Sequence, residues 1–209
     1  MQTWHLDNAE ELAAQYRYTF YKPSQEVIAR LAPGDCVKLI FRFDSNDPDA
    51  PAAERMWVVV DEVLPLGHFI GRLDNQPRYI TDLKHNDQVA FEGCHIINTQ
   101  LDDEVGGLVE RYARRCFVTR RVLDDGCPVG YLYREEPDDE EDSGWRITAN
   151  DESEDYMGEA ENLAYVSLGV VLNLDDTFIE LLDEPAGAAY VRNPETGQFE
   201  PCEDEGSDR

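Results

Sequence analysis

Two dense clusters of carboxylate side chains lie in the second half of the chain, and they are the groups most able to do chemistry. Seven acids occupy residues 135–142, and six more occupy residues 151–161. Between the clusters, residues 144–150 form an aromatic and β-branched run that is typical of a strand. We therefore expect both clusters to be held on folded structure, where a fixed negative surface favours a positively charged partner.

The negative charge of the chain is concentrated in the same half. The whole chain has 45 Asp and Glu against 18 Lys and Arg, a formal net charge of −27. Residues 1–115 contain 19 acids and 12 bases, whereas residues 116–209 contain 26 acids and 6 bases. This charge argues against nucleic acid or an anionic membrane as a direct ligand. High net charge also keeps proteins soluble and monomeric, which is the alternative explanation for the clusters.

The sequence lacks the common motifs of catalysis. It has no phosphate-binding loop, no nucleophile elbow and no zinc-binding His-Glu-x-x-His helix. Cys94 and His95 are adjacent, and neighbours on a strand would point to opposite faces. An EF-hand loop starting at Asp139 would fail where it needs an apolar residue and a closing Glu, because Arg146 and Asn150 stand there. We expect no enzyme activity, no cofactor and no dedicated metal site.

Cysteine usage and hydropathy indicate a cytoplasmic protein. The five cysteines are widely spaced, as reduced thiols usually are. No run approaches the roughly 18–20 apolar residues of a membrane span. The first residues also lack the basic region and apolar core of a secretory signal.

Aromatic residues lie close to both acidic clusters in sequence. Aromatic side chains are frequent interface anchors, while charge accelerates encounter and gives selectivity. The alternative for each ring, including Tyr131 and Tyr133 on one strand face, is a place in the core of a small sheet. The predicted partner-binding residues are Glu135, Glu136, Asp138, Asp139, Glu140, Glu141, Asp142, Trp145, Asp151, Glu152, Glu154, Asp155 and Tyr156.

In the first half of the chain, two helices precede a group of strands. Residues 7–17 have helical periodicity, with Asp7 and Glu10 spaced like a capping box. A second short helix is expected after Pro23-Ser24. Alternating patterns then predict strands over residues 35–43, 55–63, 68–73 and 88–91. Short strands joined by tight turns favour a bent sheet or partial barrel.

In the second half, residues 101–112 have the spacing of an amphipathic connecting helix. Strands are expected over residues 116–123, 129–134 and 144–150, followed by an apolar segment at 163–174. A short helix capped by Asp175 or Asp176 and a hairpin across residues 188–200 complete the pattern.

These elements predict an α+β protein of two small domains. The N-terminal domain, residues 1–100, is expected to be a bent sheet or partial β-barrel with preceding helices. Residues 101–115 form the connecting helix in this prediction. Residues 116–202 are expected to form an acidic domain with an antiparallel sheet and short helices, followed by a disordered tail at 203–209.

Several blocks in the second half resemble a bacterial domain family that was first labelled as of unknown function and later grouped with immunity proteins of polymorphic toxin systems. The blocks that carry the resemblance occur in order at residues 116–123, 126–137, 142–146, 171–175 and 181–185. In the first half, residues 56–60, 71–77 and 83–89 are similar to a second, uncharacterised family of small β domains. His85-Asn86 stands where that family is expected to have Lys-Gly or Lys-Lys-Gly.

The first resemblance implies a protein that binds a toxin in the cytoplasm of the producing cell. It supplies no catalytic residues. The charge distribution agrees with it, because nuclease toxins carry basic clefts that an acidic surface could occupy. The leading hypothesis is an immunity protein that covers the basic active site of a secreted antibacterial toxin. A nuclease is the kind of toxin expected. The alternatives are a regulatory or scaffold protein with a basic cellular partner, and an enzyme that uses clustered carboxylates with a divalent metal.

Overall fold

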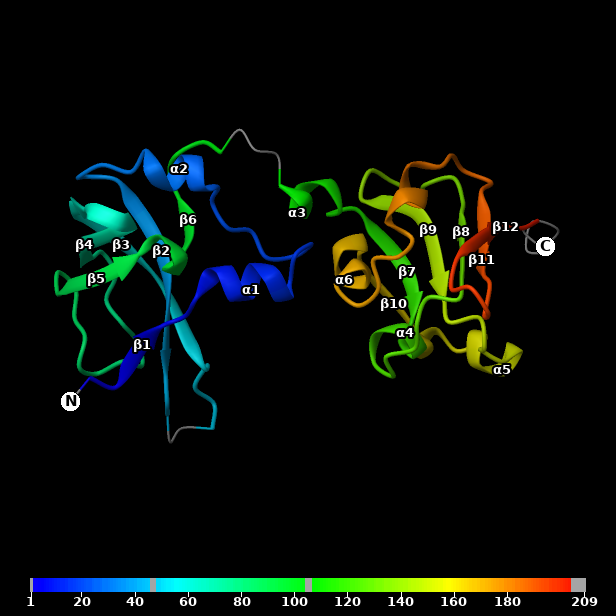
Figure 1. Cartoon of the computed structure of the whole chain (residues 1–209). Coiled ribbons are helices and arrows are strands. Elements are labelled where there is room, and N and C mark those ends of the chain that lie inside the picture. The colour runs from blue at the N-terminus through cyan, green and yellow to red at the C-terminus, as the bar shows by residue number, and fades with distance from the viewer. Residues whose placement is uncertain (1, 46–47, 104–106, 204–209) are drawn as a thin grey trace. The chain divides into compact units, whose positions relative to one another are not determined.

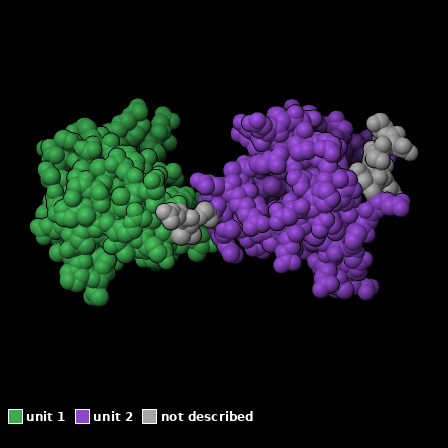
Figure 2. Space-filling model, turned by 90° about the horizontal axis from the view of Figure 1, so that it is seen from above, with its two compact units in different colours: residues 1–16, 20–106 green, residues 17–19, 107–209 purple. Residues whose placement is uncertain are grey.

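The computed structural model describes residues 2–45, 48–103 and 107–203 (Figure 1). The chain divides into two compact units, shown in different colours in Figure 2. The N-terminal unit comprises residues 1–16 and 20–106, and the C-terminal unit comprises residues 17–19 and 107–209. Each unit has its own six-stranded sheet and its own hydrophobic core. The α+β class expected from the sequence is confirmed.

The sheet of the N-terminal unit is antiparallel and nearly closes into a barrel, as predicted. Strand β2 pairs with β3 along one edge and with both β1 and β6 along the other, which bends the sheet around its core. The short strands β1 and β6 were not expected from the sequence. The strands are β1 (Trp4–Leu6), β2 (Cys36–Phe43), β3 (Ala53–Leu64), β4 (His68–Leu73), β5 (Gln88–Glu92) and β6 (Ile96–Thr99).

Two short helices, α1 (Ala9–Gln15) and α2 (Gln25–Ala29), precede β2, and 3-10 turns η1 (Pro65–Gly67) and η2 (Gly93–His95) follow β3 and β5. Helix α2 begins as predicted, because the Ser24 hydroxyl accepts the Val27 N–H. The predicted capping box of α1 is wrong. The cap is Asn8, whose side chain accepts the Glu10 N–H at 2.9 Å, whereas Asp7 binds Arg42 at 2.7 Å.

The sheet of the C-terminal unit has the strand order β10-β7-β9-β8-β11-β12. Strands β7 and β9 are parallel and the other neighbours are antiparallel, so the sheet is mixed, whereas an antiparallel sheet was expected. Strand β9 is inserted between β7 and β8 in the sheet. It runs antiparallel to β8 and parallel to β7. The strands are β7 (Arg115–Thr119), β8 (Tyr131–Arg134), β9 (Asp142–Thr148), β10 (Leu163–Ser167), β11 (Ala189–Arg192) and β12 (Phe199–Pro201).

The helices of the C-terminal unit are short: α3 (Leu108–Arg111), α4 (Arg120–Leu123), α5 (Glu154–Met157) and α6 (Leu168–Leu172), with 3-10 turns η3 (Ala160–Asn162) and η4 (Ile179–Asp183). The strand predicted over residues 116–123 ends at Thr119. From there α4 begins, with ion pairs of Arg120 to Asp124 and Arg121 to Asp125 at the i,i+4 spacing that favours a helix.

Two other predictions for this half concern segments that the structure describes only in part. The connecting helix predicted over residues 101–112 is helical only from Leu108 to Arg111, since residues 101–103 are not helical. Residues 104–106 lie outside the described residues, and so do residues 204–209 of the predicted disordered tail.

Residues 17–19 belong to the C-terminal unit although they come early in the chain. Tyr18 is buried, and its ring makes an edge contact with Tyr112 at a centroid distance of 5.7 Å. Its backbone N–H donates to the Asn173 side chain at 3.0 Å and its hydroxyl donates to Asp176 at 2.8 Å. The C-terminal unit is therefore completed by a segment that lies far from it in sequence.

Candidate partner-binding surface

The two acidic clusters lie at opposite ends of strand β9. The acidic loop, residues 135–141, connects β8 to β9, and the second cluster begins after β9 ends at Thr148. At about 3.3 Å per residue, the ends of a seven-residue strand are about 20 Å apart. The clusters therefore occupy two ends of one sheet, as the course of β9 in Figure 1 shows.

Asp142, the last acid of the first cluster, is part of the interior. Its carboxylate accepts two hydrogen bonds from Arg146, at 3.0 and 3.1 Å, and one from the Gly144 N–H at 2.9 Å. Burial by itself raises the pKa of Asp142, but the hydrogen bonds and the positive charge of Arg146 lower it to about 2. Asp142 is therefore a structural carboxylate and is not available to a partner, contrary to the prediction.

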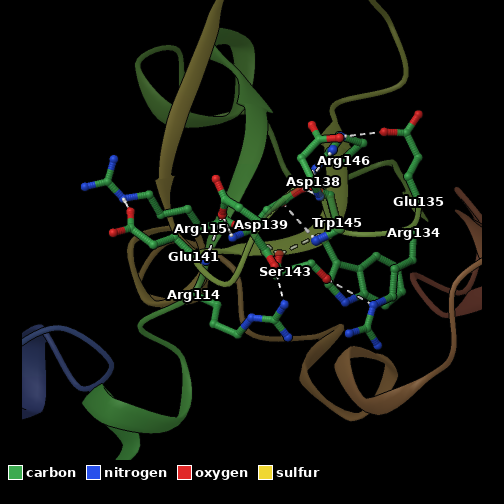
Figure 3. Close-up of polar contacts among 12 residues, drawn as sticks. Arg114, Arg115, Arg134, Glu135, Asp138, Asp139, Glu141, Ser143, Trp145 and Arg146 are labelled. Carbon is green, nitrogen blue, oxygen red and sulfur yellow. Dashed lines mark hydrogen bonds and ion pairs between the residues drawn. The ribbon is translucent and has the colours of Figure 1, made fainter.

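The remaining acids of the loop divide into those that hold the loop together and those that do not. Asp139 accepts the backbone N–H groups of Glu141 and Asp142. Glu135 pairs with Arg146 at 2.8 Å, and Glu141 approaches Arg115 at 3.8 Å (Figure 3).

Three acids of the loop have exposed carboxylates without a partner among the described residues. The side chains of Glu136, Asp138 and Glu140 are exposed and have no hydrogen bond or ion pair to any residue that the structure describes. They are the members of the first cluster that a partner could neutralise.

The second cluster divides in the same way. The Glu152 carboxylate accepts hydrogen bonds from the Thr119 hydroxyl and from the N–H groups of Ala149 and Asp151, so it closes the turn after β9. Asp151 pairs with Arg121 at 2.6 Å, and hydrogen bonds from this arginine lower the Asp151 pKa.

Around helix α5, the charge of the second cluster stays exposed. Glu154 and Asp155 lie in the first turn of α5, which Ser153 caps, and both side chains are exposed. The predicted contact residue Tyr156 is half-buried in the same turn.

The structure places Trp145, which was predicted as an interface anchor, in the core of the C-terminal unit. Trp145 is 0% exposed, its indole N–H donates to the Leu182 carbonyl at 3.4 Å, and the guanidinium of Arg134 lies 5.7 Å from its ring centroid. The alternation along β9 places Trp145 and Arg146 on opposite faces, but alternation does not say which face is covered. The structure covers the Trp145 face, where Val118, Leu132 and Ile147 join it in the core.

The other face of the sheet carries the aromatic residues that remain accessible. Phe117 lies between Tyr165 on β10 and Arg146 on β9, and Arg146 is in turn opposite Tyr133 on β8. Tyr131 and Tyr133 share this face, as their spacing predicts. We call Phe117, Tyr131, Tyr133 and Tyr165 the aromatic face. None of these four rings belongs to the hydrophobic core that the described residues form.

The rings of the aromatic face form two contacting pairs, and two arginines lie over rings of the first pair. The centroids of Phe117 and Tyr165 are 4.7 Å apart, and those of Tyr131 and Tyr133 are 5.6 Å apart. The Arg146 guanidinium lies 4.9 Å from the Phe117 centroid, and that of Arg115 lies 5.4 Å from the Tyr165 centroid. Phe117 and Tyr165 were not among the predicted partner-binding residues. Their signal in the sequence is the alternation of these rings with the neighbouring Cys116, Val118 and Val166 along the strands.

The acidic loop borders the aromatic face. The pKa of Tyr165 is raised, first by desolvation and then by the negative charges of Asp139, Asp142 and Glu141. At the other end of the same face, Thr119 on β7 donates its hydroxyl to Glu152 in the second cluster. Acids therefore border the aromatic face at both ends of the sheet.

A cavity of about 260 Å³ opens on the C-terminal unit, and three arginines at positions 111, 114 and 134 line it. Ser143 also lines the cavity, but it is not arranged as a nucleophile. Its hydroxyl donates to the Arg115 carbonyl at 2.6 Å, and no histidine that could act as a base is among the lining residues. Arg114 and Arg134 each donate to backbone carbonyls. These arginines hold the ends of the surrounding loops.

Across the described residues, no group of three His, Cys, Asp or Glu side chains is placed to hold a metal ion. Within residues 2–45, 48–103 and 107–203, no helix has the length and apolar character that a membrane crossing needs.

Comparison with known proteins identifies the C-terminal half. Residues 116–203 match the family model described as the Immunity protein Imm33 domain. The match does not extend to the N-terminal unit, and no curated protein and no solved structure matches the chain. The matched segment includes both acidic clusters and the aromatic face. The C-terminal region of this chain therefore carries an Imm33 immunity protein domain, the kind of domain that implies neutralisation of a toxin.

Proposed function

We propose that the protein neutralises a nuclease toxin by binding it, and that exposed acids of the C-terminal unit direct the toxin's basic active site onto the protein. The observation that carries the proposal is that several carboxylates remain exposed once the buried and paired acids are set aside, among them Glu136, Asp138, Glu140, Glu154 and Asp155. A basic cleft that binds the phosphates of a nucleic acid is complementary to such a surface. Binding without catalysis is the activity typical of immunity proteins.

The proposal is tested by co-expression. The probe is the toxin domain encoded by the open reading frame upstream of this gene, expressed in a laboratory bacterium with and without the full chain. We expect the domain to stop growth alone, and the full chain to restore growth and to co-elute with the domain in gel filtration. Toxicity that the full chain does not relieve, without a complex, would overturn the proposal. An upstream gene without a toxin would favour a basic cellular partner instead.

The exposed acids of the loop should act mainly on the rate of association. In the variant Glu136→Gln, Asp138→Asn, Glu140→Gln, we expect the association rate constant for the toxin domain to fall about tenfold at 0.01 M salt. The effect should vanish towards 1 M salt, because the Debye length falls from about 30 Å to about 3 Å. Stopped-flow mixing across a salt series measures both.

The matched control carries the same chemical changes on the N-terminal unit: Glu26→Gln, Asp44→Asn and Glu62→Gln, all exposed positions. This variant has the same net charge as the loop variant, so it isolates position from total charge. Equal slowing in both variants would show that net charge alone steers the encounter. Unchanged rates in both would mean that association is not steered by these acids.

A further inference from the structure

We infer that the aromatic face is the centre of the toxin-binding interface, and that the acidic loop and residues 151–155 form its charged rim. This inference rests on the proposed function. The occupant is a toxin surface with basic side chains around an apolar centre. Trp145 is in the core, so the rings of the aromatic face, on the opposite side of the same sheet, contribute the binding energy in its place.

The rings of the aromatic face are only partly covered: Phe117 is exposed, and Tyr131, Tyr133 and Tyr165 are half-buried. A sheet normally covers its hydrophobic faces, and a contiguous apolar patch left open on a soluble protein marks an interaction site. Here the helices that contribute buried residues, α4 and α6 with η4, all pack into the core behind the sheet. Phe117, on the other face, is 37% exposed although it is a large apolar residue at the middle of β7.

The chemistry of the patch is that of an interface centre. Arg115 and Arg146 each lie over a ring and each also reach an acid of the loop, at 3.8 and 2.8 Å. Aromatic and arginine side chains are the residues most enriched at the centres of interfaces, and polar residues form the rim around them. The strands fix the rings before binding, which reduces the entropy lost on association.

A second copy of this chain and a basic toxin are the two candidate occupants. A symmetric dimer would place the same patch of two copies face to face. The rims of both copies are acidic, with six acids against two arginines at the loop end, so they would repel each other. A partner with a basic surface would be attracted by the same acidic rims. Charge complementarity therefore selects a basic toxin surface over a second copy of this chain.

The inference is tested with the double variant Phe117→Ala, Tyr165→Ala in the full chain, and with the toxin domain used above. We expect the dissociation constant to rise about thirtyfold or more, almost entirely through faster dissociation. The association rate at low salt should stay close to wild type, because the acids remain. The control is Tyr16→Ala, which removes another exposed ring, 43% exposed, from the N-terminal unit and should change neither rate.

A second measurement does not depend on the variant folding. Oxidative footprinting of the wild-type complex should protect Phe117, Tyr131, Tyr133 and Tyr165, while Tyr16 should oxidise as fast as in the free protein. If wild type neutralises the toxin but these four rings are unprotected and the double variant binds normally, the inference fails and the proposed function stands. If wild type forms no complex, the proposed function itself fails. Concentration-dependent dimers that the double variant abolishes would assign the face to a second copy and overturn the inference.

Discussion

Replacing Asp142 by Asn is expected to lower the free energy of unfolding by about 3–5 kcal/mol, the range found when one partner of a buried ion pair is removed. Asp142 is 1% exposed and binds the Arg146 guanidinium through both carboxylate oxygens. An amide turns one acceptor into a donor that faces the guanidinium. Urea unfolding, followed by tryptophan fluorescence, measures the loss.

The control for this prediction is Glu140→Gln, a similar loss of one charge two residues away on an exposed side chain. It should change the unfolding free energy by no more than about 0.5 kcal/mol. Equal stability of the two variants would show that Asp142 contributes no more than a surface charge.

Acid should remove the contribution of Asp142. Its pKa is lowered to about 2 in the folded protein, whereas an unperturbed aspartate titrates near about 3.9. A group with a lowered folded-state pKa stabilises the protein above the unfolded value and loses that effect as the pH falls through the folded value. The stability difference between wild type and Asp142→Asn should therefore be constant above about pH 5 and shrink as the pH falls from about 4 towards 2.

Replacing Trp145 by Ala is expected to cost about 3–5 kcal/mol of unfolding free energy, the usual range for deleting a large aromatic side chain from a core. Trp145 is 0% exposed and packs within the main cluster of the C-terminal unit. Calorimetry should show a lower transition temperature for that unit, while the dissociation rate of the folded fraction from the toxin stays unchanged. Faster dissociation with an unchanged transition temperature would restore Trp145 to the interface. Phe117→Ala provides the contrast, because that ring is on the open face.

Local patterns were sufficient where an element is long or has a strong cap. The alternation in residues 55–63 predicted β3, and Pro23-Ser24 predicted the start of α2. Strands β1 and β6 have three and four residues, and unlike the equally short β8 and β11 they were not predicted. The parallel pairing of β7 with β9 depends on β8 lying beyond β9, which is long-range information.

The acidic clusters are visible in the sequence, but the contacts of each acid are not. The sequence identified thirteen residues, but the geometry separates free acids such as Glu136 from structural acids such as Glu152. That separation depends on which backbone N–H groups reach each carboxylate, as the Ala149 N–H reaches Glu152 at 2.8 Å. The place of Trp145 in the core was not predicted for a related reason, because one-residue alternation leaves the covered face undetermined.

The place of Tyr18 in the core of the C-terminal unit affects the order in which the protein can be completed during synthesis. Residues 17–19 leave the ribosome before most of the N-terminal unit, yet their partners Asn173 and Asp176 are among the last parts of the chain to be made. Tyr18 therefore cannot make these hydrogen bonds until the second sheet has been synthesised and has folded. Recombination that transferred only residues 116–203 to another protein would leave this segment behind, and the side chains of Asn173 and Asp176 would lose the hydrogen bonds that Tyr18 donates to them.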